Sequence, residues 1–155
     1  MKIHHYQQIV KWTGNRGEGT LNYQAYDRNY TIEIDGKSVQ YGSADPAFRG
    51  VPDKINPEDM LLSAVSTCHM LWFLHLCADA GITVVSYTDT PEAWMDEIPG
   101  QGGKFNRILL HPVISILEMG RQEEANALHT AAGKKCFITN SCNFPVEYAP
   151  ICQTN

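Results

Sequence analysis

The hydrophobic and polar positions of this chain divide it into segments with strand or helix character. Residues 3–12 carry apolar and aromatic side chains with partial alternation, and residues 20–26 and 30–34 are rich in Thr, Tyr and Ile. Such runs are typical of strands, and the Asp35-Gly36 pair that follows the third run is a hairpin signal. The first third of the chain therefore predicts a small antiparallel meander.

A long apolar helix is predicted from Asn56 to about Ala80. Asn56 suits the N-cap, Pro57 suits the first helical position, and Gly81 is a typical C-terminal stop. Apolar residues cover most of the circumference of this segment, so we expect the helix to be buried on several sides. Its serines, histidines and aspartate make it too polar for a lipid-facing span.

The rest of the chain returns to strands and adds one more helix. Residues 82–95 and 107–118 are rich in strand formers and flank a turn rich in Pro and Gly, which predicts a long hairpin. Residues 121–135 predict a second helix, with acids early and lysines late, and residues 144–151 predict a last strand. This order predicts a single α+β domain over residues 1–155, with antiparallel sheet packed on two helices.

Composition and charge narrow the range of functions. The net charge is −5 and no long basic run occurs, which argues against a nucleic-acid partner. The N-terminus lacks an apolar core of signal-peptide length, so we expect a cytoplasmic protein with no membrane partner. Two apolar helices are hard to cover in 155 residues, which favours a homodimer.

The chain has five cysteines without the spacing of a disulfide framework: Cys68, Cys77, Cys136, Cys142 and Cys152. In a reducing compartment, any disulfide that forms should be transient and catalytic. Cys68 and Cys77 are nine positions apart and face opposite sides of the helix, and Cys77 is predicted to pack in the core. No Cys-x-x-Cys pair occurs, and Cys68 and His75 are seven positions apart, so we expect no metal and no bound cofactor.

A reactive Cys68 needs a cation beside its thiolate. Arg16, in a glycine-rich turn, and Arg49, shortly before the long helix, are the candidates, because a guanidinium stays charged when it is buried. Glu58 could hold such an arginine by a bidentate contact. On one straight helix Glu58 and Cys68 are ~15 Å apart along the axis, so a site with both needs a broken helix or a second copy of the chain. His69 points about 100° away from Cys68 and is a poor base for it.

Three stretches of the chain resemble the OsmC/Ohr family, which comprises osmotically inducible protein C and the organic hydroperoxide resistance proteins. They are Asn56-Pro57-Glu58-Asp59-Met60-Leu61, Ser66-Thr67-Cys68-His69 and Ala80-Gly81-Ile82. The resemblance spans most of the chain, and the length and element order agree with it. It implies antiparallel β-sheets wrapped around two central helices in an intertwined homodimer. It also implies a thiol-dependent peroxidase that reduces organic hydroperoxides.

The same resemblance implies roles for five residues. Cys68 matches the peroxidatic cysteine, Cys136 the resolving cysteine, and Glu58 the residue that orients the catalytic arginine. Arg16 resembles the Ohr-type arginine position and Arg49 the OsmC-type position, and the spacing slightly favours Arg49. The implied reductant is an external dithiol, such as a lipoyl group on a lipoylated protein.

Departures from the family pattern keep other functions open. His69 and Phe137 stand where the family often has phenylalanine and proline, and Ser141-Cys142-Asn143 is also unusual. The main alternative is a non-catalytic module that binds an acyl or thiol-containing ligand near Cys68. Acyl transfer through Cys68 would not need Cys136, and a purely structural domain would show slow labelling of Cys68.

Overall fold

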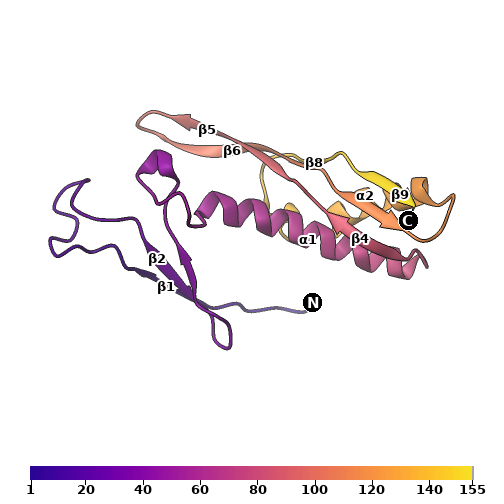
Figure 1. Ribbon diagram of the computed structural model, residues 1–155, viewed down its shortest axis with the longest axis horizontal. Coiled ribbons are helices and arrows are strands. Elements are labelled where there is room, and N and C mark those ends of the chain that lie inside the picture. The colour runs from indigo at the N-terminus through magenta and orange to yellow at the C-terminus, as the bar shows by residue number, and fades with distance from the viewer. Residues whose placement is uncertain (155) are drawn as a thin grey trace. The chain divides into compact units, whose positions relative to one another are not determined.

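The computed structural model describes residues 1–154, drawn in Figure 1. The chain divides into two compact units, Met1–Leu61 and Leu62–Asn155. The single domain over residues 1–155 stays a prediction, and each unit is described by itself.

The first unit contains a three-stranded antiparallel sheet in the order β1-β2-β3. Its strands are β1 (Ile9–Trp12), β2 (Tyr30–Glu33) and β3 (Gln40–Gly42), followed by the short 3-10 helix η1 (Pro46–Phe48). An antiparallel meander is present, as predicted, but its third strand is β3 and not the predicted strand over residues 20–26, which is wrong because residues 20–25 form turns and bends.

Local side-chain bonds hold these turns and the glycine-rich turn before them. The Asn15 side-chain oxygen accepts hydrogen bonds from the N–H groups of Gly17 and Gly19, at 2.8 and 3.0 Å. The Asn22 side-chain oxygen accepts one from the Gln24 N–H at 2.9 Å. Such bonds compete with a strand ladder for the backbone donors.

The long helix α1 (Pro57–Asp79) begins and ends where the sequence predicts. The Asn56 side-chain oxygen accepts a hydrogen bond from the Asp59 N–H at 2.7 Å, and the Asp59 carboxylate accepts one from the Asn56 N–H at 3.1 Å. This reciprocal pair is a capping box. Gly81, with φ of 66°, provides the left-handed residue after the helix.

The predicted long hairpin of the second unit is confirmed, with a break in each arm. Strand β4 (Val84–Thr88) pairs antiparallel with β7 (Val113–Ile116), and β5 (Glu92–Ile98) pairs antiparallel with β6 (Gly102–Leu110). Prolines without an N–H donor lie at both breaks, at positions 91 and 112.

The end of the chain corrects the prediction of a purely antiparallel sheet. The segment predicted as one strand, residues 144–151, contains β8 (Val146–Tyr148) and ends where a further strand, β9 (Ile151–Thr154), begins, with Pro150 between the two. Strand β8 pairs parallel to β6, and β9 pairs parallel to β7, so both sheets of this unit are mixed. The predicted second helix is confirmed as α2 (Gln122–Lys135).

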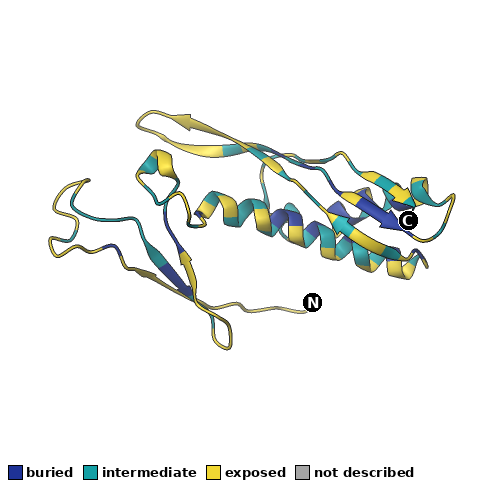
Figure 2. Cartoon of the chain, in the orientation of Figure 1, coloured by how far each residue is buried: buried dark blue, intermediate teal, exposed yellow. Residues whose placement is uncertain are grey.

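The core of the second unit contains residues from α1, β7 and α2, and Figure 2 marks the buried positions. Its buried members are Phe73, Cys77, Ile82, Ile114, Ile116, Ala125 and Ala132. Cys77 is therefore a core residue, as predicted. A single chain buries only one face of α1, and Leu71 on another face is 63% exposed, so the expectation of burial on several sides is not met within one chain.

Candidate functional site: three thiols around the end of α2

Cys68 and Cys136 come from different helices of the second unit. Cys68 lies in α1 and is half-buried, while Cys136 is fully buried. Cys136 follows the last residue of α2 as its C-cap, with an extended backbone, and its N–H bonds to the Ala132 carbonyl at 2.9 Å. The structure thus places Cys136 just beyond the end of a helix, in agreement with the helix predicted over residues 121–135.

The two thiols lie next to one another. The Cys136 side chain hydrogen-bonds to the Cys68 thiol, and the backbone N–H groups of Phe137 and Ile138 act on the same sulfur. Neither cysteine is bridged. The packing of α1 against the end of α2 thus brings together two thiols that are far apart in the sequence.

Burial raises the pKa of the Cys68 thiol, and its hydrogen bond with Cys136 raises this pKa further. The N–H groups of Ile138 and Phe137 lower it, but they do not reverse the balance. Within residues 62–154, no arginine or lysine acts on this thiol. Cys68 is therefore protonated at neutral pH in the environment of its own unit, and a reactive thiolate needs added positive charge.

A third thiol lies in the same place. The 3-10 helix η2 (Thr139–Ser141) follows Cys136 and turns the chain back, so that the half-buried Cys142 donates a hydrogen bond to the Ile138 carbonyl at 3.3 Å. Burial and the neighbouring Cys136 raise the pKa of the Cys142 thiol. The sequence analysis did not place Cys142 in the site. The sequence feature that could have indicated it is the short, turn-forming segment after Cys136.

Arg16 belongs to the first unit, where its guanidinium is engaged with the backbone. It donates hydrogen bonds to the carbonyls of Ala25, at 3.1 Å, and Gln24, and its Nε lies 3.8 Å from an Asp27 carboxylate oxygen. These contacts close the loop between β1 and β2.

Arg49 has a different environment in the same unit. It ends η1 in the left-handed conformation, with φ of 65°, and it is the one non-glycine residue with positive φ among residues 1–154. Its guanidinium lies 5.9 Å from the centre of the Tyr23 ring, and no hydrogen bond from it occurs within residues 1–61. A strained backbone with an uncommitted guanidinium is typical of functional positions.

Glu58, in the first turn of α1, is also in the first unit. Its Oε2 atom is buried and has no hydrogen-bond partner in the described part of the chain. A buried carboxylate oxygen without a partner is costly and favours a guanidinium as its ligand. The five predicted site residues thus fall into two groups: the structure brings Cys68 and Cys136 together, and it describes Arg16, Arg49 and Glu58 within the first unit.

Comparison with known proteins identifies the family of the chain. The family model described as OsmC-like protein matches residues 50–149, which include Glu58, Cys68 and Cys136. The chain belongs to the OsmC family. Among curated protein sequences, none matches it.

Solved structures agree with the OsmC fold. An OsmC-like protein of unknown function from Vibrio cholerae is 28% identical, with a TM-score of 0.85 over 96% of this chain and 100% of its own. An organic hydroperoxide resistance protein from Elizabethkingia anophelis is 21% identical, with a TM-score of 0.68 over 98% and 99%. The organic hydroperoxide resistance protein OsmC from Legionella pneumophila is 22% identical, with a TM-score of 0.67 over 97% and 99%. The predicted α+β, OsmC-like fold with two helices is confirmed.

Family membership also explains the apolar character of α1. By length and composition alone this helix could cross a membrane, but a core helix of a soluble protein passes the same test. In this OsmC-family chain α1 is the core helix of a soluble fold.

The OsmC-fold core also holds a histidine pair that the sequence analysis missed. His69 Nε2 and His129 Nδ1 are 2.9 Å apart, and both side chains are buried. Tyr148 stacks on His69 at 4.6 Å, and Phe73 stacks on His129 at 3.9 Å. Burial lowers the pKa of His69 to about 4 and that of His129 to about 3, so both rings are neutral at pH 7.

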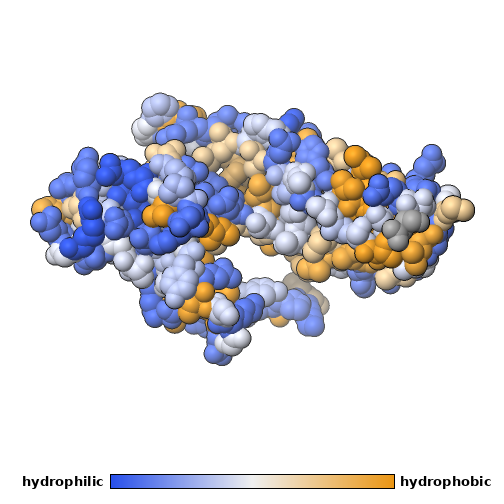
Figure 3. Space-filling view, in the orientation of Figure 1, coloured by the Kyte–Doolittle hydropathy of each residue, from blue (hydrophilic) through white to orange (hydrophobic). Residues whose placement is uncertain are grey.

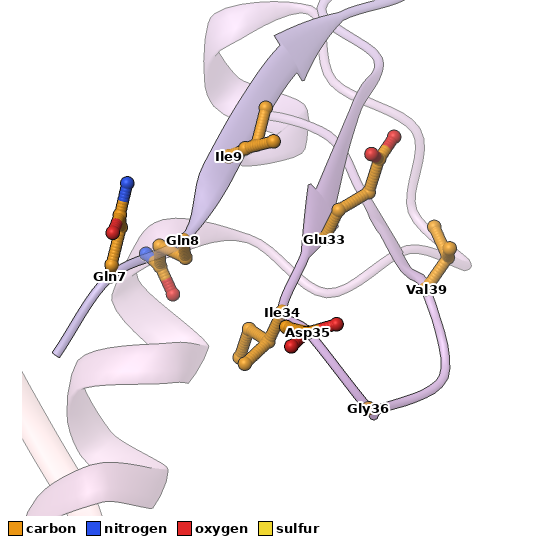
Figure 4. A pocket seen from close by; sticks show the side chains of 8 residues that line it. All are labelled: Gln7, Gln8, Ile9, Glu33, Ile34, Asp35, Gly36 and Val39. Atoms are coloured by element: carbon orange, nitrogen blue, oxygen red, sulfur yellow. The ribbon is translucent and has the colours of Figure 1, made fainter.

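A separate pocket of about 520 Å³ lies in the first unit beside the β2–β3 hairpin (Figure 4). Its polar lining includes Gln7, Glu33 and Asp35, and Glu33 is paired with Lys11 at 2.8 Å. It contains no cysteine, so it is not the thiol site. Among residues 1–154, no three side chains come together as a metal site.

Proposed function

We propose that this OsmC-family chain is a thiol-dependent peroxidase that reduces organic hydroperoxides to alcohols. The observation that carries the proposal is the contact between the Cys68 and Cys136 side chains. One thiol is half-buried and can meet a substrate, and the other is fully buried beside it. Two proteins with the same fold are named organic hydroperoxide resistance proteins, which supports the same substrate class.

In the proposed first step, the Cys68 thiolate attacks the terminal oxygen of the hydroperoxide. The O–O bond breaks, Cys68 becomes a sulfenic acid, and the departing alkoxide takes a proton to form the alcohol. Backbone N–H groups of Phe137 and Ile138 near the sulfur favour its charged form.

In the second step, the Cys136 thiol attacks the sulfenic sulfur, and the pair forms a disulfide with loss of water. An external dithiol, such as a lipoyl group on a lipoylated protein, then reduces the disulfide by exchange. This scheme uses no bound metal or cofactor.

The raised pKa of Cys68 in its own unit makes a cation essential to this scheme. We assign that role to Arg49, since its guanidinium makes no hydrogen bond in its unit, whereas Arg16 is bound to backbone carbonyls. Glu58, with an unpaired buried oxygen, would hold the guanidinium in place.

We also propose that the working form is a cytoplasmic homodimer. Exposed apolar residues of the second unit include Leu71 on α1 and Val85 on β4. Figure 3 shows apolar patches on the surface of the chain. Burial of this surface against a second copy would remove apolar area from water. Gel filtration with light scattering should give twice the 17.4 kDa mass of the chain.

The direct test is Cys68→Ser, with Cys77→Ser as the matched control from the same helix. The first variant should lose consumption of cumene hydroperoxide in the presence of dihydrolipoamide, because the nucleophile is gone. The second should keep it, because Cys77 packs in the core. Full activity of Cys68→Ser would refute the assignment.

One observation favours a second candidate, a module that binds a thiol-containing or acyl ligand without turnover. The raised pKa of Cys68 describes a protonated thiol, which is a weak nucleophile. Steady peroxide turnover with a dithiol would exclude the binding module. Ligand binding without turnover would favour it.

A further inference from the structure

We propose that Cys142 is a second resolving cysteine, which takes over the disulfide from Cys68 and passes it to the reductant. The inference rests on the proposed peroxidase function and deepens it. It concerns the route by which Cys68 returns to its reduced state.

The backbone of Ile138 is a shared neighbour of Cys68 and Cys142. The Ile138 N–H acts on the Cys68 sulfur, and the Ile138 carbonyl accepts the hydrogen bond from the Cys142 thiol at 3.3 Å. The two thiols therefore contact opposite ends of one residue.

The η2 turn holds Cys142 beside Cys136 as well. The Thr139 N–H donates to the Cys136 sulfur at 3.3 Å, and the Thr139 carbonyl accepts from the Cys142 N–H at 3.1 Å. Cys142 also packs against the buried cluster of Val65, Ile108 and Leu110. The three thiols thus form one cluster in which Cys136 neighbours both of the others.

The three cysteines differ in their exposure to solvent, and this difference sets the order of the proposed exchange. Cys136 is completely buried, whereas Cys68 and Cys142 are both half-buried. An external dithiol cannot reach the Cys136 sulfur, so it can open a Cys68–Cys136 disulfide only by attack at Cys68, inside the peroxide site. A Cys136–Cys142 disulfide would instead offer the Cys142 sulfur and leave Cys68 free for the next peroxide.

The exchange step balances without an added reactant. The Cys142 thiolate attacks the Cys136 sulfur, the Cys68–Cys136 bond breaks, and Cys68 leaves as a thiolate that takes the proton given up by Cys142. The dithiol then reduces the Cys136–Cys142 disulfide and becomes a disulfide itself. Peroxide remains the only oxidant.

Trypsin separates the two disulfides by mass, because of where the lysines lie. Cys68 falls in the peptide 55–104, while Cys136 and Cys142 share the peptide 136–155. A Cys68–Cys136 disulfide links the two peptides, and a Cys136–Cys142 disulfide makes peptide 136–155 lighter by two hydrogen atoms. Cys152→Ser is the background, since it removes the third cysteine of that peptide.

Full-length Cys152→Ser protein is treated with one equivalent of cumene hydroperoxide, and free thiols are then blocked with iodoacetamide. We expect the internal disulfide in peptide 136–155 and an alkylated Cys68. Adding Cys142→Ser should replace the internal disulfide completely by the link between the two peptides. Its peroxide turnover with dihydrolipoamide should fall, while oxidation of Cys68 in a single turnover should not change.

Two outcomes would overturn the relay. If the linked peptides persist in the Cys152→Ser protein and Cys142→Ser turns over at the same rate, the relay is wrong and the peroxidase proposal stands. If peroxide oxidises neither Cys68 nor Cys136, both proposals fall.

Discussion

At the residue scale, the environment of Cys68 opposes the charge that its proposed chemistry requires. Burial and the neighbouring Cys136 thiol raise its pKa, and the backbone N–H groups of Ile138 and Phe137 act the other way. The first unit contains the complementary features, an uncommitted guanidinium at Arg49 and an unpaired buried oxygen at Glu58.

The change Arg49→Gly should separate activity from stability. Glycine adopts the left-handed conformation freely, so the change should relieve about 1 kcal/mol of backbone strain and leave the free energy of unfolding equal or slightly higher. Peroxide consumption should fall sharply, because the proposed cation is lost. Urea denaturation and a peroxide assay measure the two effects.

Arg16→Lys is the control for that prediction. Lysine cannot reproduce the fork that binds the carbonyls of Gln24 and Ala25, so a small loss of stability with retained activity is expected. Loss of activity in Arg16→Lys with full activity in Arg49→Gly would reverse the assignment of the arginine.

At the element scale, α2 is positioned by a close approach to β8. Gly133 lies in α2 where an added Cβ would overlap the Tyr148 hydroxyl and come 2.7 Å from its Cζ atom. Tyr148 cannot easily move, because its ring stacks on His69 at 4.6 Å. Since Cys136 follows three residues later, this contact also sets the place of the buried thiol.

Gly133→Ala should therefore destabilise the protein by about 1–3 kcal/mol through overpacking. This is opposite in sign to the usual effect in a helix, where alanine is favoured over glycine by about 1 kcal/mol. Thermal and urea unfolding measure the change. The exposed Ala127 gives the control, since Ala127→Gly in the same helix should show the ordinary loss. A stabilised Gly133→Ala would contradict the packing described for Tyr148.

At the scale of the whole molecule, the buried histidine pair links stability to pH. His69 and His129 have folded-state pKa values of about 4 and about 3, below the ordinary value of 6.5. Burial is the main cause for both, and Asp89 acts in the opposite direction on His69. Between pH 6.5 and about 4 the unfolded chain binds more protons than the folded one, so stability is lost as pH falls through this range.

The free energy of unfolding should fall by up to about 1.4 kcal/mol per pH unit for each of the two histidines. His69→Phe keeps a ring for stacking and removes one titrating group, so it should lower this slope by about half. Urea denaturation from pH 7 to pH 4.5 measures it, and equal slopes for the wild type and His69→Phe would contradict the prediction.

The sequence by itself determined the elements and the family. Caps, glycine stops and apolar periodicity are local signals, and they predicted α1, α2, the long hairpin and the core position of Cys77. The errors also have local causes. The Asn22 side chain accepts a hydrogen bond from the Gln24 N–H and favours a turn over a strand there, and Pro150 separates the predicted last strand from β9.

Only the tertiary structure decided which thiols meet. Cys68 reaches Cys136, and Cys142 returns to both, because α1 packs against the end of α2 and η2 reverses the chain. The pairing of His69 with His129, 60 positions apart, arises from the same packing. No periodicity encodes such contacts, since they depend on how separate elements share one core. The environment that raises the pKa of Cys68 therefore appears only when the chain is folded.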